Sequence, residues 1–146
     1  MPILTEPSDI RALLSRTRRI AVLGIKTEAA AAQPAFYVPK ACLELGYDIV
    51  PVPVYYPEAT HILGRAVFRS LAEVSPRVDM VNVFRRPQDL AAHFDDIVLA
   101  HPKSVWLQTG ISDDAFAAKL SALGIDVVQD KCLMVEARRE GSFGNK

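Results

Sequence analysis

Residues 20–24 read Ile-Ala-Val-Leu-Gly, and this stretch decides the fold class. Its apolar side chains do not alternate with polar ones, which predicts a strand buried on both faces. Such strands belong to parallel sheets that carry helices on each side. The flanking segments agree, because residues 10–14 have apolar side chains at helical spacing and a second helix is predicted over 35–45, ending at Gly46.

The rest of the chain repeats this alternation of strand and helix. Further strands are predicted at 48–52, 66–68, 78–84, 104–108 and 125–129. Helices are predicted after a cap at Ser8 or Asp9, from Pro87, after a cap at Ser112 and over 132–139, with a frayed tail at 141–146. Pro51 predicts that its strand leaves the ladder there. The sequence therefore predicts an α/β fold of three layers, a Rossmann-like doubly wound sheet that is mainly parallel and has five to six strands.

Length and composition limit the class of protein. The 146 residues suit a single domain over 1–146, and 50% of them are hydrophobic, which is enough for a substantial core. The formal net charge of +0 argues against a nucleic-acid or acidic-membrane binder, which normally carries a basic excess. No apolar run approaches the roughly 20 residues that span a bilayer, and we expect no secretory signal. Cys42 and Cys132 lack metal-type spacing and fit a reduced, cytoplasmic protein.

Basic side chains gather where the predicted strands end. In open parallel sheets, ligands bind beyond the carboxyl ends of the strands, at the point where the strand order reverses. Lys26, Arg85, Arg86 and Lys131 follow predicted strands, and Lys40 lies about a turn into the helix after the first loop. Arginine forks and free backbone N–H groups bind phosphate well. The sequence favours an anionic ligand at this edge over the alternative that these are ordinary solvated charges.

The same edge lacks the pattern of the common dinucleotide sites. Only Gly24 stands at the end of the first strand, and no second glycine follows before Gly46, so the G-x-G-x-x-G motif is absent. The acidic residue that holds the ribose hydroxyls of NAD is absent from 51–54, which reads Pro-Val-Pro-Val. A carboxylate there would repel a phosphorylated ribose. Its absence is therefore compatible with coenzyme A or with NADP.

Short segments along most of the chain match a known family in their order and spacing. They are IAVLG (20–24), PAFYVPK (34–40), LGY (45–47), IVPV (49–52), ILG (62–64), SL (70–71), DMVNVFRRP (79–87), VWLQTGI (105–111) and DKCLMVE (130–136). Between about Ile10 and Glu136 the chain resembles the small stand-alone CoA-binding proteins. That family is related to the CoA-binding domain of the succinyl-CoA synthetase α subunit.

The resemblance implies that coenzyme A or an acyl-CoA binds at the C-terminal edge of the sheet. The loop 24–27 and the helix behind it would receive the pyrophosphate, and 52–53 would line the adenine side. Residues 84–85 would face the nucleotide, 108–111 the pantetheine, and Lys40 a phosphate. The implied cofactor-binding residues are Gly24, Ile25, Lys26, Thr27, Tyr37, Lys40, Val52, Pro53, Phe84, Arg85, Arg86, Gln108, Gly110 and Ile111.

Two positions depart from the family pattern. The family reads Pro-Val-Asn-Pro-basic after the second strand, where this chain reads Pro-Val-Pro-Val-Tyr at 51–55. The family also carries Arg-Pro before the second helix, where this chain has Gln33 and Pro34. Both changes remove polar or positive groups near the expected nucleotide. They predict either a weaker affinity for coenzyme A or a different ligand.

We expect binding without catalysis. The synthetase relatives need a phosphohistidine and a second domain, and we find neither in this sequence. His61 is predicted in a loop, and His93 and His101 on the solvent side of or just after the helix from Pro87; none pairs with a nucleophile by sequence. Two alternatives stay open: an NADP-type nucleotide-dependent oxidoreductase, and an interaction subunit whose nucleotide pocket is vestigial.

Two further features each allow two interpretations. Cys132 follows the last strand on the predicted ligand edge. It either forms a mixed disulfide with the CoA thiol under oxidation or, as is more usual for a free cysteine, packs a turn as a small buried residue. Tyr55, Tyr56 and Pro57 form an exposed aromatic loop that either covers the adenine or packs on its own sheet edge.

Overall fold

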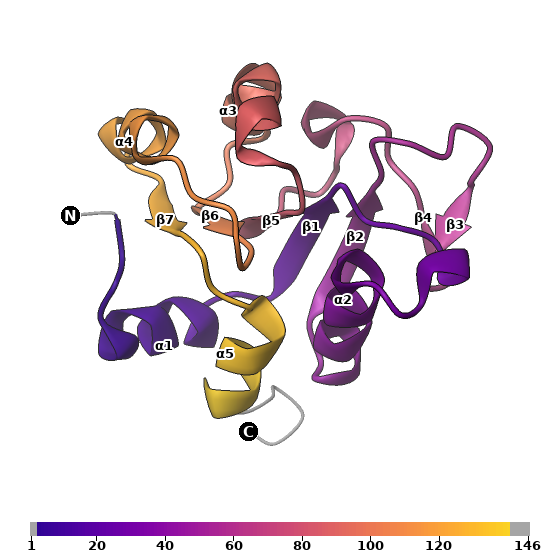
Figure 1. Cartoon of the computed structure of the whole chain (residues 1–146), viewed down its shortest axis with the longest axis horizontal. Helices are drawn as coiled ribbons and strands as arrows, with labels where there is room; N and C mark the ends of the chain where they lie inside the picture. The colour runs from indigo at the N-terminus through magenta and orange to yellow at the C-terminus, as the bar shows by residue number, and fades with distance from the viewer. Residues whose placement is uncertain (1–2, 141–146) are drawn as a thin grey trace.

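The computed structural model describes residues 3–140 (Figure 1). The strands are β1 (Arg19–Leu23), β2 (Asp48–Val52), β3 (His61–Ile62), β4 (Arg65–Ala66), β5 (Met80–Val83), β6 (Ser104–Leu107) and β7 (Asp126–Val128). The α-helices are α1 (Pro7–Ser15), α2 (Pro34–Glu44), α3 (Phe94–Ala100), α4 (Asp114–Ala122) and α5 (Leu133–Glu140). Three short 3₁₀ helices complete this part of the chain: η1 (Glu28–Ala30), η2 (Leu71–Glu73) and η3 (Pro87–His93). None of the helices within residues 3–140 is long and apolar enough to cross a membrane.

A five-stranded sheet in the order β2-β1-β5-β6-β7 forms the centre of the molecule. All of its neighbouring strands run parallel, with Leu23 opposite Val52 on one side and opposite Val83 on the other. The chain moves outward from β1 to β2 and then crosses back to β5, so the strand order reverses between β1 and β5. This is the switch point at which open parallel sheets bind ligands.

Each central strand contributes side chains to two separate hydrophobic cores, one on each face of the sheet. Ala21 and Leu23 of β1 join the core beneath α3 and α4, whereas Ile20 and Val22 join the core beneath α1, α2 and α5. The two groups of helices cover opposite faces of the sheet (Figure 1). Burial on both faces is the physical reason why the strand sequence is continuously apolar. The structure confirms the predicted three-layer, Rossmann-like α/β fold.

The strand predicted at 66–68 is wrong in extent and in partner. Residues 65–66 instead form β4, which pairs antiparallel with β3 in a separate hairpin. Leu63 and Gly64 both have positive φ, as a two-residue hairpin turn requires. Phe68 donates its backbone N–H to the Pro51 carbonyl at 3.0 Å, outside the regular ladder.

Pro51 does not end its strand, contrary to expectation. It stays opposite Val22, and the pairing continues to Val52. Carbonyl directions alternate along β2, so that of Val52 accepts from Gly24 after β1, whereas that of Pro51 points to the outer side of this edge strand and accepts from Phe68. The N–H that proline lacks lies on the same outer side, so the ladder to β1 loses no hydrogen bond.

Helix starts also differ from prediction. Asp113, not Ser112, caps α4, with its Oδ1 accepting the Phe116 N–H at 3.0 Å. α1 begins at Pro7 rather than after a cap at Ser8 or Asp9, and Glu6, which precedes it, makes no side-chain cap hydrogen bond. The helix predicted from Pro87 begins as η3 and becomes α-helical only at Phe94. The predicted tail at 141–146 lies outside the described residues.

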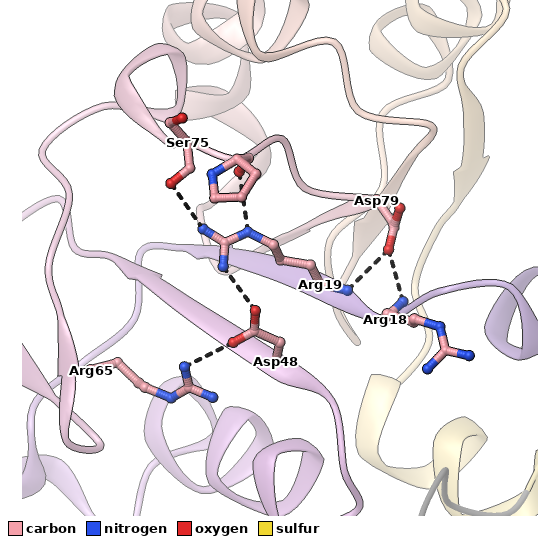
Figure 2. Close-up of polar contacts among 7 residues, drawn as sticks. Arg18, Arg19, Asp48, Arg65, Ser75 and Asp79 are labelled. Carbon is pink, nitrogen blue, oxygen red and sulfur yellow. Dashed lines mark hydrogen bonds and ion pairs between the residues drawn. The ribbon is translucent and has the colours of Figure 1, made fainter. Parts of the chain in front are cut away.

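A polar network fastens the strands at their amino ends (Figure 2). Asp79 Oδ2 accepts the backbone N–H groups of Arg18 and Arg19 at 2.9 and 3.0 Å. Arg19 Nη1 lies 2.8 Å from Asp48 Oδ2, and Arg65 of the hairpin pairs with Asp48 Oδ1 at 2.8 Å. The network connects the starts of β1, β2 and β5 with the hairpin. The network therefore stabilises the amino ends of these strands.

Candidate functional site

A cleft of about 360 Å³ opens at the carboxyl ends of β1, β5 and β6. Its walls come from the loop after β1, the first turn of α2, and the loops after β5 and β6. The residues that line it are Lys26, Gln33, Pro34, Ala35, Phe84, Arg85, Arg86, Pro87, Gln108, Thr109, Gly110 and Ile111. The volume lies within the range of small-molecule sites, about 300–1,000 Å³. The cleft is therefore at the predicted switch point and is large enough for part of a nucleotide ligand.

Gly24 brings the two loops of the switch point together. Its N–H donates to the Val52 carbonyl at 2.9 Å, and its φ is +86°. A Cβ at this position would lie 2.5 Å from the carbonyl oxygen of Phe84. Only glycine permits both this backbone angle and this approach. The loop after β1 can therefore lie directly against the loop that carries Phe84 and Arg85.

The cleft carries three basic side chains in different surroundings. Lys26 Nζ donates to Gln33 Oε1, so the glutamine that replaces the family's arginine holds this ammonium group. The Arg85 side chain is only 15% exposed, whereas that of Arg86 is 71% exposed. Arg86 Nε lies 2.9 Å from Asp89 Oδ2, and this hydrogen bond holds the pKa of the Asp89 carboxyl below its ordinary value. The charge of Arg86 is thus partly balanced. Arg85 has a longer contact with the same carboxylate, 3.7 Å from Nη2 to Asp89 Oδ2, and Lys26 has no carboxylate within 4.0 Å in the described part of the chain.

The inner wall contains a buried amide pair that the sequence analysis did not identify. Gln108 Oε1 accepts hydrogen bonds from the Leu133 backbone N–H at 3.2 Å and from Asn82 Nδ2 at 3.3 Å. A backbone N–H can only donate, so the Gln108 atom that it contacts must be the oxygen. Asn82 Nδ2 also donates to the Trp106 carbonyl at 3.3 Å, which fixes the orientation of both amides. Asn82 stands in the middle of an otherwise apolar strand, and this isolated polar residue is the sequence signal that was missed.

Half of the predicted binding residues line the cleft: Lys26, Phe84, Arg85, Arg86, Gln108, Gly110 and Ile111. The others do not: Gly24, Ile25, Thr27, Tyr37, Lys40, Val52 and Pro53. Ile25 and Val52 are each 1% exposed, and their side chains belong to the two cores rather than to the wall of the cleft. Tyr37 is exposed on α2, and Lys40 pairs with Glu44 at 3.0 Å on the same helix. Thr27 borders a separate hollow beside Tyr56.

Four other lining residues were not predicted at the site: Gln33, Pro34, Ala35 and Pro87; Thr109 also lines the cleft and was expected only as part of the segment 108–111. Gln33 precedes α2, and Pro34 and Ala35 form its first turn, with Pro34 at a position where its missing N–H costs nothing. Gln33, Pro34 and Ala35 could have been predicted at the site from the start of α2 directly after the first loop, because helix N-termini bind anionic ligands.

The histidines and the second cysteine differ in part from expectation. His61 lies in β3 rather than in a loop, and His101 ends α3 on the surface. His93 is half-buried and accepts a hydrogen bond from Arg85, so its predicted solvent-facing position is wrong. Cys132 is partly buried and packs against the core beneath α1, α2 and α5. It is absent from the residues that line the cleft.

Comparison with known proteins identifies the family. Residues 18–138 match the model of the CoA binding domain. The chain belongs to the CoA-binding domain family. This CoA-binding domain is also 31% identical over 128 residues to the protein YneT of Bacillus subtilis (strain 168), an alignment that covers 88% of this chain and 91% of YneT.

Solved structures have the same fold. A Thermus thermophilus protein, cell-free ID.343, is 37% identical with a TM-score of 0.84, covering 93% of this chain and 99% of its own. A protein from Pyrococcus horikoshii OT3 is 27% identical with a TM-score of 0.82, covering 92% of each chain. An acetyl-coenzyme A synthetase of Ca. Korarchaeum cryptofilum shares the fold alone, with 17% identity and a TM-score of 0.64 over 75% of this chain and 25% of the synthetase.

Proposed function

We propose that this CoA-binding domain binds coenzyme A or an acyl-CoA in the cleft, as a cytoplasmic binding protein without catalysis of its own. The observation that carries the proposal is the composition of the cleft. Lys26, Arg85 and Arg86 offer positive charge, while Phe84 and Ile111 offer apolar surface beside them. Coenzyme A combines the same two properties, an anionic nucleotide and a long, mainly uncharged pantetheine arm. The family match supports this ligand.

The inner wall suits the pantetheine arm. Gln108 is only 4% exposed, and its Oε1 is committed to Leu133 and Asn82. The Nε2 group is then the part of this side chain left to serve a ligand, and it can only donate. A pantetheine amide or a thioester presents carbonyl oxygens that accept such a bond. The pantetheine arm carries two amide carbonyls along its length, whereas NADP has a single amide carbonyl, on the nicotinamide ring.

The absence of catalysis is proposed from the same residues. Within the described part of the chain, the cleft is lined by no histidine, cysteine, aspartate, glutamate or serine. Nucleophilic and acid–base catalysis depend on a reactive side chain placed beside a base. Lys26 and Thr109 bring an amine and a hydroxyl to the lining, but neither has a carboxylate or an imidazole beside it there, and Lys26 is held by Gln33. Incubation with acetyl-CoA should therefore release no free thiol above the rate in buffer.

Isothermal titration with coenzyme A tests the binding site. Arg85→Ala should weaken affinity by about 1–3 kcal/mol through loss of a charge-assisted contact. Arg77→Ala is the matched control, because Arg77 is exposed and precedes β5 at the opposite edge of the sheet. An equal effect of the two substitutions would remove Arg85 from the site and leave only a general effect of charge.

A further inference from the structure

Three groups hold the Arg85 side chain from different directions. Its Nε donates to His93 Nε2 at 3.1 Å, and its Nη2 lies 3.7 Å from Asp89 Oδ2. Its Cζ lies 5.6 Å from the centre of the Tyr55 ring, a cation–π distance. Arg85 lines the cleft, whereas His93, Asp89 and Tyr55 do not. Any effect of His93, Asp89 and Tyr55 on a ligand in the cleft is therefore indirect and passes through the position of Arg85.

The contact with His93 requires a neutral imidazole. A guanidinium group has five N–H donors and no acceptor, so His93 Nε2 must be the unprotonated nitrogen. The charged groups that face His93 are Arg85, Asp89 on η3 and Asp96 on α3. Asp96 is itself engaged, since its carboxylate accepts the backbone N–H groups of Leu71 and Ala72 at 2.7 and 2.9 Å. Burial and the neighbouring Arg85 charge hold the pKa of His93 below its ordinary value, which keeps the ring neutral near pH 7.

Tyr55 stands where the family resemblance led us to expect a basic residue, and its ring contacts Arg85. The family carries a basic residue at this place, and here the aromatic ring lies against the Arg85 guanidinium instead. The Tyr55 ring lies over the Arg85 guanidinium, and Arg85, although its side chain is only 15% exposed, still lines the cleft. An arginine held in this way loses less side-chain entropy when it binds a phosphate than a freely rotating one.

We propose that His93 is a positioning residue for ligand binding: its Nε2 fixes the Arg85 guanidinium so that the remaining N–H groups of Arg85 bind a phosphate group of the nucleotide. This inference rests on the proposed function, because the phosphate is that of coenzyme A. His93 does not contact the ligand. Arg86, which follows in the sequence, is 71% exposed, and its Nε hydrogen-bonds to the Asp89 carboxylate at 2.9 Å, so part of its charge is balanced where that of Arg85 meets a neutral acceptor.

Two substitutions of His93 distinguish the contribution of its ring to packing from that of its hydrogen-bond acceptor, Nε2. His93→Phe keeps a ring in the half-buried site and removes the acceptor, and His93→Gln keeps an acceptor oxygen and removes the ring. Isothermal titration with coenzyme A should show binding weaker by about threefold to tenfold for His93→Phe, because Arg85 then loses its side-chain freedom only when the ligand binds, and a change below about threefold for His93→Gln. His61→Leu is the control, because His61 is exposed in β3, does not line the cleft, and has its ring Nδ1 3.2 Å from the hydroxyl of the adjacent Thr60.

A double-mutant cycle tests whether His93 acts through Arg85. In the Arg85→Ala background, His93→Phe should cause no further loss of affinity. Thermal unfolding of every variant shows which ones fold, and His93→Leu replaces His93→Phe if the larger ring prevents folding. The cycle requires only the whole protein and coenzyme A.

Each outcome decides between the two proposals. A wild-type protein that does not bind coenzyme A overturns the proposed function and the role of His93 with it. Wild-type binding with full affinity in His93→Phe overturns the positioning role alone. Wild-type binding with an equal loss in both backgrounds also overturns it, because His93 would then act independently of Arg85. Loss in His93→Phe, rescue in His93→Gln and no loss in the Arg85→Ala background support it.

Discussion

Gly24→Ala is the substitution whose cost follows most directly from the structure. The new Cβ would lie 2.5 Å from the Phe84 carbonyl oxygen and 3.2 Å from the Phe84 carbonyl carbon. Both are backbone atoms, so no rotamer change relieves the collision. A left-handed backbone angle costs a residue with a side chain about 1–2 kcal/mol, and forced displacement of packed atoms adds about 1–3 kcal/mol. We expect the free energy of unfolding to fall by about 2–5 kcal/mol.

Gly124→Ala is the matched control for this experiment. Gly124 has nearly the same φ, +83°, but a Cβ there meets nothing within 4 Å. Only the backbone angle should count, at about 1–2 kcal/mol. Urea unfolding followed by circular dichroism gives both values, and the difference between the variants measures the collision with Phe84. Equal destabilisation of the two variants would refute the close approach of the loops after β1 and β5. Gly24→Ala should also weaken coenzyme A binding, because the collision displaces Phe84 and Arg85.

Three further predictions concern other parts of the molecule. Because the pKa of His93 is lowered in the folded protein, its contribution to stability is full above pH 6.5 and declines as pH falls toward the folded-state pKa. Thermal unfolding between about pH 7.5 and about pH 5 should therefore show a smaller acid-induced decrease in His93→Gln than in the wild type, and identical profiles would contradict this. Burial raises the pKa of the Cys42 thiol to about 12, so iodoacetamide should modify Cys132 first in the folded protein; earlier labelling of Cys42 by peptide mass spectrometry would count against its burial. Asp79→Ala leaves the N–H groups of Arg18 and Arg19 without their carboxylate and should cost about 1–3 kcal/mol in denaturant unfolding, whereas Asp79→Asn, which retains an acceptor, should recover most of that loss.

The sequence predicted the central sheet because the local signal and the tertiary environment agree. Continuous apolar runs such as 20–24 are typical of strands covered on both faces, and the two cores on either side of β1 confirm this. The alternation of strands and helices predicted a ligand edge at the carboxyl ends of the strands, and the structure places the reversal of strand order between β1 and β5. Lys26, Arg85 and Gln108 were placed at the site for the same reason, since each follows the end of a strand.

Short elements were predicted less well, because tertiary contacts decide them. Residues 66–68 contain β-branched and aromatic side chains, but the turn at 63–64 pairs the start of this segment with β3 instead of the main sheet. Asp113 caps α4 although Ser112 is an equally suitable residue type. In such cases, neighbouring residues of similar propensity compete, and contacts far away in the sequence choose between them.

Within the site, residues adjacent in sequence have different environments. Ile25 and Lys26 share the first loop, yet Ile25 enters the core and Lys26 faces the cleft. His93 follows Arg85 by eight residues, and the course of η3 between them brings the imidazole to the guanidinium. Whether a residue enters the core or faces the cleft depends on the direction of its side chain, and the position of a residue after a strand does not determine that direction.

The central claim is that the cleft binds coenzyme A. Isothermal titration of the purified protein with coenzyme A, with NADP and NAD as comparators at the same salt concentration, tests it most directly. We predict micromolar or tighter binding of coenzyme A and little heat with either dinucleotide. Clear binding of NADP without binding of coenzyme A would contradict the claim and favour a nucleotide-dependent oxidoreductase. No binding of any of the three would contradict it as well and indicate that the changes at Gln33 and Pro53 have disabled the site.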